Sequence, residues 1–366
     1  MTKKLLINSL LSLAAVLLVL TGIGFWLASL VPAAPDHDTL ALTKPEDLTY
    51  LQQKPDAHRG KILMVVSSTQ QMGNTGRKTG YELTELARPY YVFTTNGFEV
   101  DIASPEGGEP RAVIDRDDMG PFDYSFLNDS VAQQKTINSL PVDAVDPDDY
   151  HAVFFVGGKA AMFDFPGNNA IQELVASIYD AGGFIGAVCH GPAALAGVTL
   201  KNGQPLLHRR QVSAFTNEEE LFLIPDADSV FPFLLEDALR QDGAVFKAGP
   251  AYLEQISVDG RLLTGQNPWS TWQLTEAMIG AMGYQPVPRT ITPAENTVAL
   301  LLTYERQGMH EARNRLQQLD GNRLDRRLLA MHGVVAAMKG ELLKTLDIIR
   351  LLARAKAASN KIREGS

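Results

Sequence analysis

The residue best suited to chemistry is Cys189, the only cysteine among the 366 residues. It directly follows the apolar run Phe184-Ile-Gly-Ala-Val and precedes His190, Gly191 and Pro192. A strand that turns sharply into a helix exposes a nucleophile at the turn, and small neighbours prevent a clash there. The positive end of the helix would lower the pKa of a thiol, and free backbone amides could stabilise an oxyanion. The pattern therefore predicts a nucleophilic cysteine.

His190 is the candidate general acid and base beside this thiol. Adjacent residues point in different directions, so its ring reaches the Cys189 sulfur only if the turn is tight. An imidazole in this role needs a carboxylate to fix its tautomer. Candidates lie in the run Glu218-Glu219-Glu220. Such a run is also typical of a solvated helix start, which the helix dipole favours, and both interpretations hold if one glutamate turns inward.

Two further glutamates, Glu82 and Glu85, lie near the start of a helix expected at residues 81–95. Their spacing places them on one face of that helix. By itself, this pattern is typical of a pair of surface carboxylates.

The elements that must position these residues alternate along the chain. Short apolar runs predict strands at residues 61–67, 98–103, 152–156, 184–188, 212–215 and 261–264. Helical patterns lie at residues 81–95, 171–181, 231–241 and 271–282, with another helix expected from Gly191. Alternation of this kind predicts an α/β fold with a parallel sheet between layers of helices. In such sheets the active site lies beyond the carboxyl ends of the strands.

The N-terminus predicts a membrane segment. A charge-free run at residues 5–35 contains about 26 apolar residues, which as a helix would span roughly 39 Å and could cross a bilayer. We therefore expect a signal anchor at residues 1–35, with cleavage near Val31-Pro32-Ala33-Ala34 and secretion as the alternative. Because Lys3 and Lys4 favour the cytoplasm, the catalytic domain is expected on the extracytoplasmic, periplasmic side of a bacterial inner membrane.

Three more segments follow this anchor. Residues 36–59 are polar and proline-punctuated, typical of a linker, and residues 60–286 carry the α/β pattern. Residues 287–366 predict an all-helical extension. An offset of 32 residues aligns Gly308 with Gly340, close to the period of tetratricopeptide helix pairs. The alternative is a simple helical appendage that packs on the domain or on a dimer partner.

Composition excludes several classes of function. The net charge of −9 argues against nucleic acid as the main partner. A single cysteine excludes an intrachain disulfide and a CxxC metal or redox site. The sequence also shows no phosphate-binding loop and no metal-ligand cluster, so we expect neither a metal nor an organic cofactor.

Several motifs occur together in an order that resembles a known family. They are TGRKTGYELTELARP, FFVGGKAAMFDFP, AVCHGPA, SAFTNEEE, FPFLLED and DGRLLTGQNPWS. The chain resembles the PfpI/class I glutamine amidotransferase-like superfamily and, more narrowly, its branch of glutathione-independent glyoxalases (glyoxalase III) and heat-shock chaperone-like proteins. This resemblance implies a flavodoxin-like catalytic domain over residues 60–286.

The resemblance also implies roles for the candidate residues. Cys189 would be the nucleophile and His190 the acid/base, with Glu220 orienting the imidazole. Glu85 would be a carboxylic acid hydrogen-bonded to the thiol. The backbone amides of Gly158 and His190 would form the oxyanion pocket.

One motif departs from the family pattern at this pocket. Many members of the branch carry Gly-Gly-His-Gly where this chain has Gly157-Gly158-Lys159-Ala160. A cation and a methyl group replace an imidazole and a hydrogen, which puts the identity of the substrate in doubt.

The expected function is a cysteine-dependent conversion of small α-oxoaldehydes, methylglyoxal to lactate or a related deglycase reaction. One alternative is a PfpI-like peptidase or amidase. Another is a membrane-tethered chaperone or redox sensor that uses reversible oxidation of Cys189. We also expect a homodimer, and a protein partner for the C-terminal helices.

Overall fold

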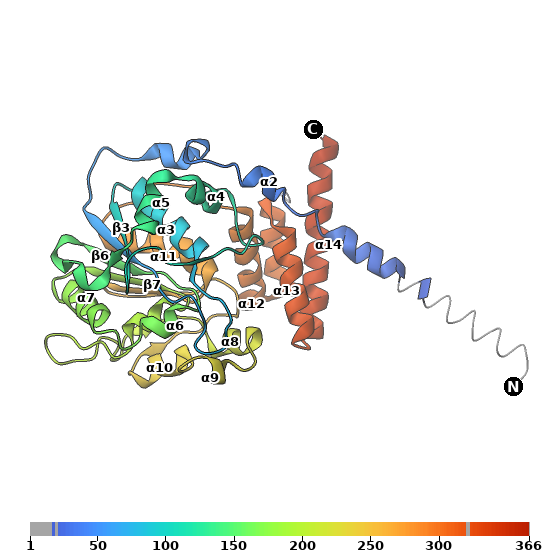
Figure 1. Cartoon of the computed structure of the whole chain (residues 1–366). Helices are drawn as coiled ribbons and strands as arrows, with labels where there is room; N and C mark the ends of the chain where they lie inside the picture. The colour runs from blue at the N-terminus through green and yellow to red at the C-terminus, as the bar shows by residue number, and fades with distance from the viewer. Residues whose placement is uncertain (1–16, 19–20, 320–322, 366) are drawn as a thin grey trace, which may run out of the picture. The chain divides into compact units, whose positions relative to one another are not determined.

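The computed structural model describes residues 17–18, 21–319 and 323–365 (Figure 1). Their internal contacts divide them into two compact units. The larger unit comprises residues 36–290, and the smaller comprises the described parts of 1–35 and 291–366.

The larger unit is built on a seven-stranded sheet with the order β10-β11-β7-β6-β1-β3-β5. Only β10 runs antiparallel to its neighbour, and the other pairs are parallel. The predicted α/β fold with a parallel sheet is therefore confirmed, with β10 as an unpredicted edge strand. The strands are β1 (Lys61–Val65), β3 (Glu99–Ser104), β5 (Leu140–Pro141), β6 (Ala152–Phe155), β7 (Phe184–Val188), β10 (Ile256–Asp259) and β11 (Leu262–Gly265).

Helices cover both faces of this sheet (Figure 1). Along β1, Ile62 and Met64 pack under one helical layer, while Leu63 and Val65 pack under the other. Burial on both faces explains why β1 is a continuous apolar run. One layer holds α3 (Leu83–Thr95), α4 (Pro121–Asn128), α5 (Ser130–Ile137) and α11 (Thr271–Ala281), and the other holds α6 (Ala161–Asp164), α7 (Asn169–Asp180), α10 (Leu235–Gln241) and the 3-10 helix η5 (Gly191–Leu195).

Two predicted elements differ from the structure. The strand expected at residues 212–215 is reduced to β8 (Gln211–Val212), which pairs with β9 (Val245–Phe246) outside the main sheet. The strand pairing does not continue at Ser213, because its backbone amide donates to the Thr264 hydroxyl and not to the carbonyl of a neighbouring strand. The helix expected from Gly191 is the 3-10 turn η5, which ends where Ala196 becomes extended (φ −64°, ψ 128°).

Residues 36–59, expected to be a linker, contain regular structure and contribute to the core of the larger unit. Tyr50 is only 5% exposed, and its hydroxyl accepts a hydrogen bond from the Asn96 side-chain amide at 3.3 Å. The short elements here are α2 (His37–Leu40), η1 (Pro45–Asp47) and η2 (Thr49–Gln53). The remaining short elements of the unit are β2 (Tyr81–Glu82), β4 (Ala112–Val113), η3 (Val142–Ala144), η4 (Pro147–Asp149), α8 (Asn217–Leu223), α9 (Ala227–Val230) and η6 (Pro268–Ser270).

The predicted transmembrane helix is contradicted. Within the described part of the chain, no helix is both long enough and apolar enough to cross a membrane. Residues 1–16 and 19–20 of the predicted anchor lie outside the described residues. The membrane-anchored, extracytoplasmic localisation derived from that anchor is therefore corrected as well.

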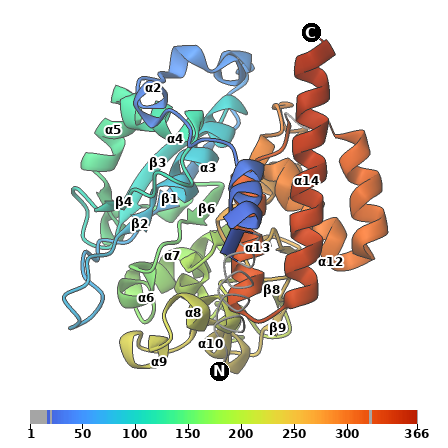
Figure 2. The same ribbon diagram turned by 90° about the vertical axis from the view of Figure 1, so that its right-hand side faces the viewer.

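The smaller unit contains the expected C-terminal helices, α12 (Pro293–Gln318), α13 (Arg326–Met338) and α14 (Leu342–Gly365) (Figure 2). Gly308 interrupts α12 with a φ of 82°, and Gly340 separates α13 from α14 with a φ of 75°. Glycine enters this left-handed region without a steric penalty. The two glycines that the 32-residue offset aligned thus occupy equivalent breaks, while a tetratricopeptide-like relationship stays a prediction. The carbonyl of Leu30 accepts a hydrogen bond from Arg326 at 3.1 Å.

Candidate active site

Cys189 lies directly after β7, at the carboxyl end of the parallel strands, as predicted. Its φ of 58° is in the left-handed region, which non-glycine residues rarely adopt. Two backbone hydrogen bonds hold this conformation: its amide donates to the Gly265 carbonyl, and its carbonyl accepts from the Phe215 amide, both at 2.9 Å. The sharp turn therefore presents the thiol at the end of the strand.

The same turn brings His190 onto the sulfur. The Cys189 Sγ lies 3.3 Å from His190 Nδ1, and His190 Nε2 lies 2.5 Å from Glu220 Oε2. A carboxylate accepts the Nε2 proton, so Nδ1 is left to accept from the thiol. The ring also packs against Phe215 and Phe231, with centroid distances of 4.6 and 6.1 Å. Thiol, imidazole and carboxylate thus form a continuous buried chain.

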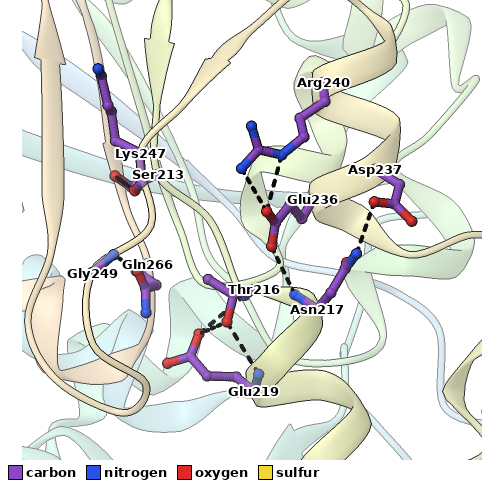
Figure 3. Close-up of polar contacts among 10 residues, drawn as sticks. All are labelled: Ser213, Thr216, Asn217, Glu219, Glu236, Asp237, Arg240, Lys247, Gly249 and Gln266. Atoms are coloured by element: carbon purple, nitrogen blue, oxygen red, sulfur yellow. Dashed lines mark hydrogen bonds and ion pairs between the residues drawn. The ribbon is translucent and has the colours of Figure 1, made fainter.

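A network of polar contacts, drawn in Figure 3, holds the start of α8 in place. Thr216 and Glu219 form a capping box: the Thr216 hydroxyl accepts from the Glu219 amide, and Glu219 Oε2 accepts from the Thr216 amide. The next residue is anchored too, because the Asn217 amide donates to Glu236 and its side chain donates to Asp237. Helix α8 is therefore held at its first turn, where Glu220 lies.

Glu219 also connects α8 to two other loops. Its Oε1 accepts from the Tyr252 amide at 2.6 Å and from the Asn267 side-chain amide at 2.9 Å. The side chain is fully buried. With all these donors, the buried Glu219 carboxylate anchors the helix. Two of the three adjacent glutamates, Glu219 and Glu220, are therefore buried, and only Glu218 is exposed.

Glu85, from α3, lies against the same sulfur. Its side chain is 0% exposed. Burial and the neighbouring Glu82 raise the pKa of Glu85 well above its usual range, although contacts with the Cys189 thiol and the Gly157 amide oppose this rise. A carboxyl in such surroundings holds its proton at neutral pH. Glu85 is therefore a carboxylic acid beside the thiol and not the surface carboxylate that its sequence pattern suggested.

The pKa of Cys189 is raised, contrary to the prediction from the helix dipole. Burial is the main cause, and an ionised Glu85 would raise the pKa further, while the Gly158 amide opposes the rise. The expected dipole is small because η5 has only five residues and is a 3-10 turn. The Cys189 thiol is thus protonated at neutral pH.

The loop after β6 carries Gly157, Gly158 and Lys159. A Cβ on Gly157 would lie 2.3 Å from Glu85 Oε2 and 2.8 Å from the Cys189 Cβ. Gly158 has a φ of 98°, and its amide lies within hydrogen-bonding reach of the Cys189 sulfur. Lys159 is partly buried, and its ammonium acts electrostatically on Glu82. The seven residues that the sequence analysis singled out therefore come from loops and helix ends near the end of β7. They are Glu85, Gly157, Gly158, Lys159, Cys189, His190 and Glu220.

The sequence analysis did not predict that Glu219 anchors α8, or that the Glu82 carboxyl is largely buried. The pattern Thr216-x-x-Glu219 is a capping-box signature and could have identified the first. No sequence signal distinguishes Glu82 from a surface residue. Among the described residues, no group of three or more His, Cys, Asp or Glu side chains is placed to hold a metal ion.

The fold and the site define a parallel α/β protein with a cysteine held in a strained turn beside a histidine and two carboxyl groups. The chain belongs to the DJ-1/PfpI family, whose model matches residues 77–212. It is 32% identical to the glutathione-independent glyoxalase HSP31 of Saccharomyces cerevisiae, over 61% of this chain and 98% of that protein. It is 29% identical to glyoxalase 3 of Candida albicans, over 60% of this chain and 98% of that protein.

Solved structures show the same relationship. The chain is similar to the Rapid Encystment Protein 24 KDa of Francisella tularensis, with 35% identity, a TM-score of 0.58 and coverage of 61% of this chain and 99% of that one. It is also similar to glyoxalase III of Candida albicans, with 26% identity, a TM-score of 0.56 and coverage of 61% and 98%. These matches cover about three fifths of the chain.

Proposed function

We propose that this protein is a glyoxalase III-type enzyme that converts methylglyoxal and related α-oxoaldehydes to 2-hydroxy acids, without glutathione. The observation that carries the proposal is the chain of contacts Cys189–His190–Glu220, with the Glu85 carboxylic acid also against the sulfur. The names of the relatives support the same reaction class. The reaction is an internal redox disproportionation of the substrate, so it needs acid and base groups and no external oxidant.

The first step is addition of sulfur to the aldehyde. His190 Nδ1 accepts the Cys189 proton across 3.3 Å, and the adjacent Glu220 carboxylate stabilises the imidazolium. The thiolate then attacks the aldehyde carbon. Protonation of the resulting oxyanion, beside the Gly158 amide, gives a hemithioacetal.

The second step moves a proton between the two substrate carbons. A base removes the proton from the former aldehyde carbon to give an enediol, and an acid returns a proton to the neighbouring carbon to give a thioester. His190 and Glu85 both contact the sulfur and are the groups assigned to this exchange. Water then cleaves the thioester, which releases lactate and restores the Cys189 thiol, so that one water is consumed per turnover.

The test is lactate formation from methylglyoxal by the purified full chain. We expect Cys189→Ala to remove turnover and Glu85→Gln to reduce it by orders of magnitude, since each group takes part in the chemical steps. Glu46→Gln, which changes an exposed carboxyl in η1, is the control and should match the wild type. Absence of turnover in a folded wild-type protein, or full turnover by Cys189→Ala, would refute the proposal.

A further inference from the structure

The ring of His190 lies against the phenyl ring of Phe215. The two ring centroids are 4.6 Å apart and the ring planes are tilted by 32°, which is closer to offset stacking than to an edge-to-face contact. Both residues are buried, with exposed fractions of 2% for His190 and 5% for Phe215. The imidazole therefore meets the π face of a phenyl ring in a site that largely excludes bulk water.

Backbone contacts hold Phe215 in this place. Its amide donates to the Cys189 carbonyl at 2.9 Å, which is one of the two bonds that maintain the left-handed turn at Cys189. The next residue, Thr216, is the N-cap of α8, and Glu220 of that helix contacts His190 Nε2. Residues 215–220 thus bring both an aromatic face and a carboxylate to the same imidazole.

A second phenyl ring, that of Phe231, lies further from the imidazole. Its centroid is 6.1 Å from that of His190, and the tilt between the two rings is again 32°. The attraction between an aromatic face and a cation extends to about 6 Å. Phe215 is therefore better placed than Phe231 to act on His190 electrostatically.

An aromatic face distinguishes the two protonation states of the imidazole. The face of a phenyl ring carries a negative partial charge and attracts a cation, and the attraction is stronger where water does not compete. The proton that leaves the Cys189 thiol across 3.3 Å converts the His190 ring to such a cation. Phe215 then favours the imidazolium over the neutral ring, from a different group than the Glu220 carboxylate.

We propose that Phe215 is a positioning residue that acts through His190. Its π face holds the imidazole between Cys189 and Glu220 and stabilises the imidazolium that forms when the thiol gives up its proton. This inference rests on the proposed function in taking His190 as the acceptor of the thiol proton. Its test is the reactivity of the thiol itself, which does not require turnover of methylglyoxal.

The experiment replaces Phe215, in the full chain, with phenylalanines that carry one, two or three ring fluorines. Fluorine withdraws negative charge from the ring face and changes the shape of the side chain little, so the series weakens the attraction stepwise. Since Cys189 is the only cysteine, the rate of alkylation by iodoacetamide reports on this thiol alone. We expect the rate to fall with each fluorine and to be about tenfold lower with three. The same series at Phe231 should give a shallower trend.

Phe93 is the control position, because it is fully buried and its ring contacts two other phenylalanines, Phe98 and Phe154. Fluorination there should leave alkylation unchanged. In His190→Gln, the trend at Phe215 should disappear, since no imidazolium can form. Urea unfolding of each protein verifies that the fold is retained.

Three results would overturn the proposal. They are an alkylation rate that does not depend on the number of fluorines at Phe215, an equal trend at Phe93, and a trend that persists in His190→Gln. A role of Phe215 in packing alone predicts the first of these, because the fluorinated rings fill nearly the same space. A failure here is distinct from a failure of the proposed function, which the lactate assay measures separately.

Discussion

Gly157 allows the sharpest test of the packing around the thiol, through the substitution Gly157→Ala. The added methyl carbon would lie 2.3 Å from Glu85 Oε2, 2.7 Å from the Val188 carbonyl oxygen and 2.8 Å from the Cys189 Cβ. Ordinary contacts of a Cβ begin at 3.4 Å, so the closest approach is short by about 1 Å. The φ of Gly157 is not in the left-handed region, so the effect comes from contact and not from backbone strain.

Two of these contacts cannot relax without consequence. The Val188 carbonyl belongs to β7, and moving it disturbs the turn that presents Cys189. Rotating Glu85 away separates the carboxylic acid from the sulfur. We expect a loss of about 1–3 kcal/mol of stability from overpacking, and turnover at least about 100-fold lower, since a displacement near 1 Å has this effect on catalytic geometry.

The assays are urea unfolding and methylglyoxal turnover, with alkylation of Cys189 as a readout that does not depend on the substrate. Gly280→Ala in α11 is the matched control, because a Cβ there meets nothing within 4 Å and its φ is ordinary. It should stabilise the helix by about 0.5–1 kcal/mol and leave activity alone. The reasoning is refuted if Gly157→Ala retains wild-type stability and activity.

Three further outcomes are expected. Glu220→Gln should lower kcat/KM for methylglyoxal by about 10²–10⁴, because the imidazolium loses its carboxylate; a change within about twofold would contradict this assignment. Thr216→Ala should cost about 1 kcal/mol in urea unfolding through loss of the capping box, and an unchanged midpoint would contradict it. Burial lowers the pKa of His332 from 6.5 to about 4, so its stabilising contribution is complete above pH 6.5 and is lost as the pH falls to about 4. Hydrogen exchange of α13 should show this acid sensitivity, and His332→Leu should remove it.

The elements that sequence predicted well are those buried on both faces. The runs of β1, β6 and β7 are uniformly apolar because helices cover the sheet on each side, and such runs are recognisable in a single sequence. The polar loops that follow them had to meet at one edge, which is why Cys189 and Gly157 could be expected together. The resemblance, and not the local pattern, indicated Glu85.

The remaining features depend on tertiary contacts that no local pattern contains. The contact between Cys189 and His190 requires the left-handed φ of Cys189, which two hydrogen bonds from distant segments maintain. The direction of the shift in the thiol pKa was wrong because burial of the sulfur outweighs the dipole of a short 3-10 turn. The predicted anchor was inferred from hydropathy over residues 1–35, whereas no helix among the described residues is long and apolar enough to cross a membrane.

The raised pKa of Cys189 has a consequence for the chemical durability of the protein. Peroxides and alkylating agents attack the thiolate, so a thiol that keeps its proton reacts slowly with them. With no second cysteine in the chain to form a rescuing intrachain disulfide, overoxidation would be permanent damage. Burial at the end of β7 thus protects the sulfur from oxidation and alkylation as long as the thiol keeps its proton.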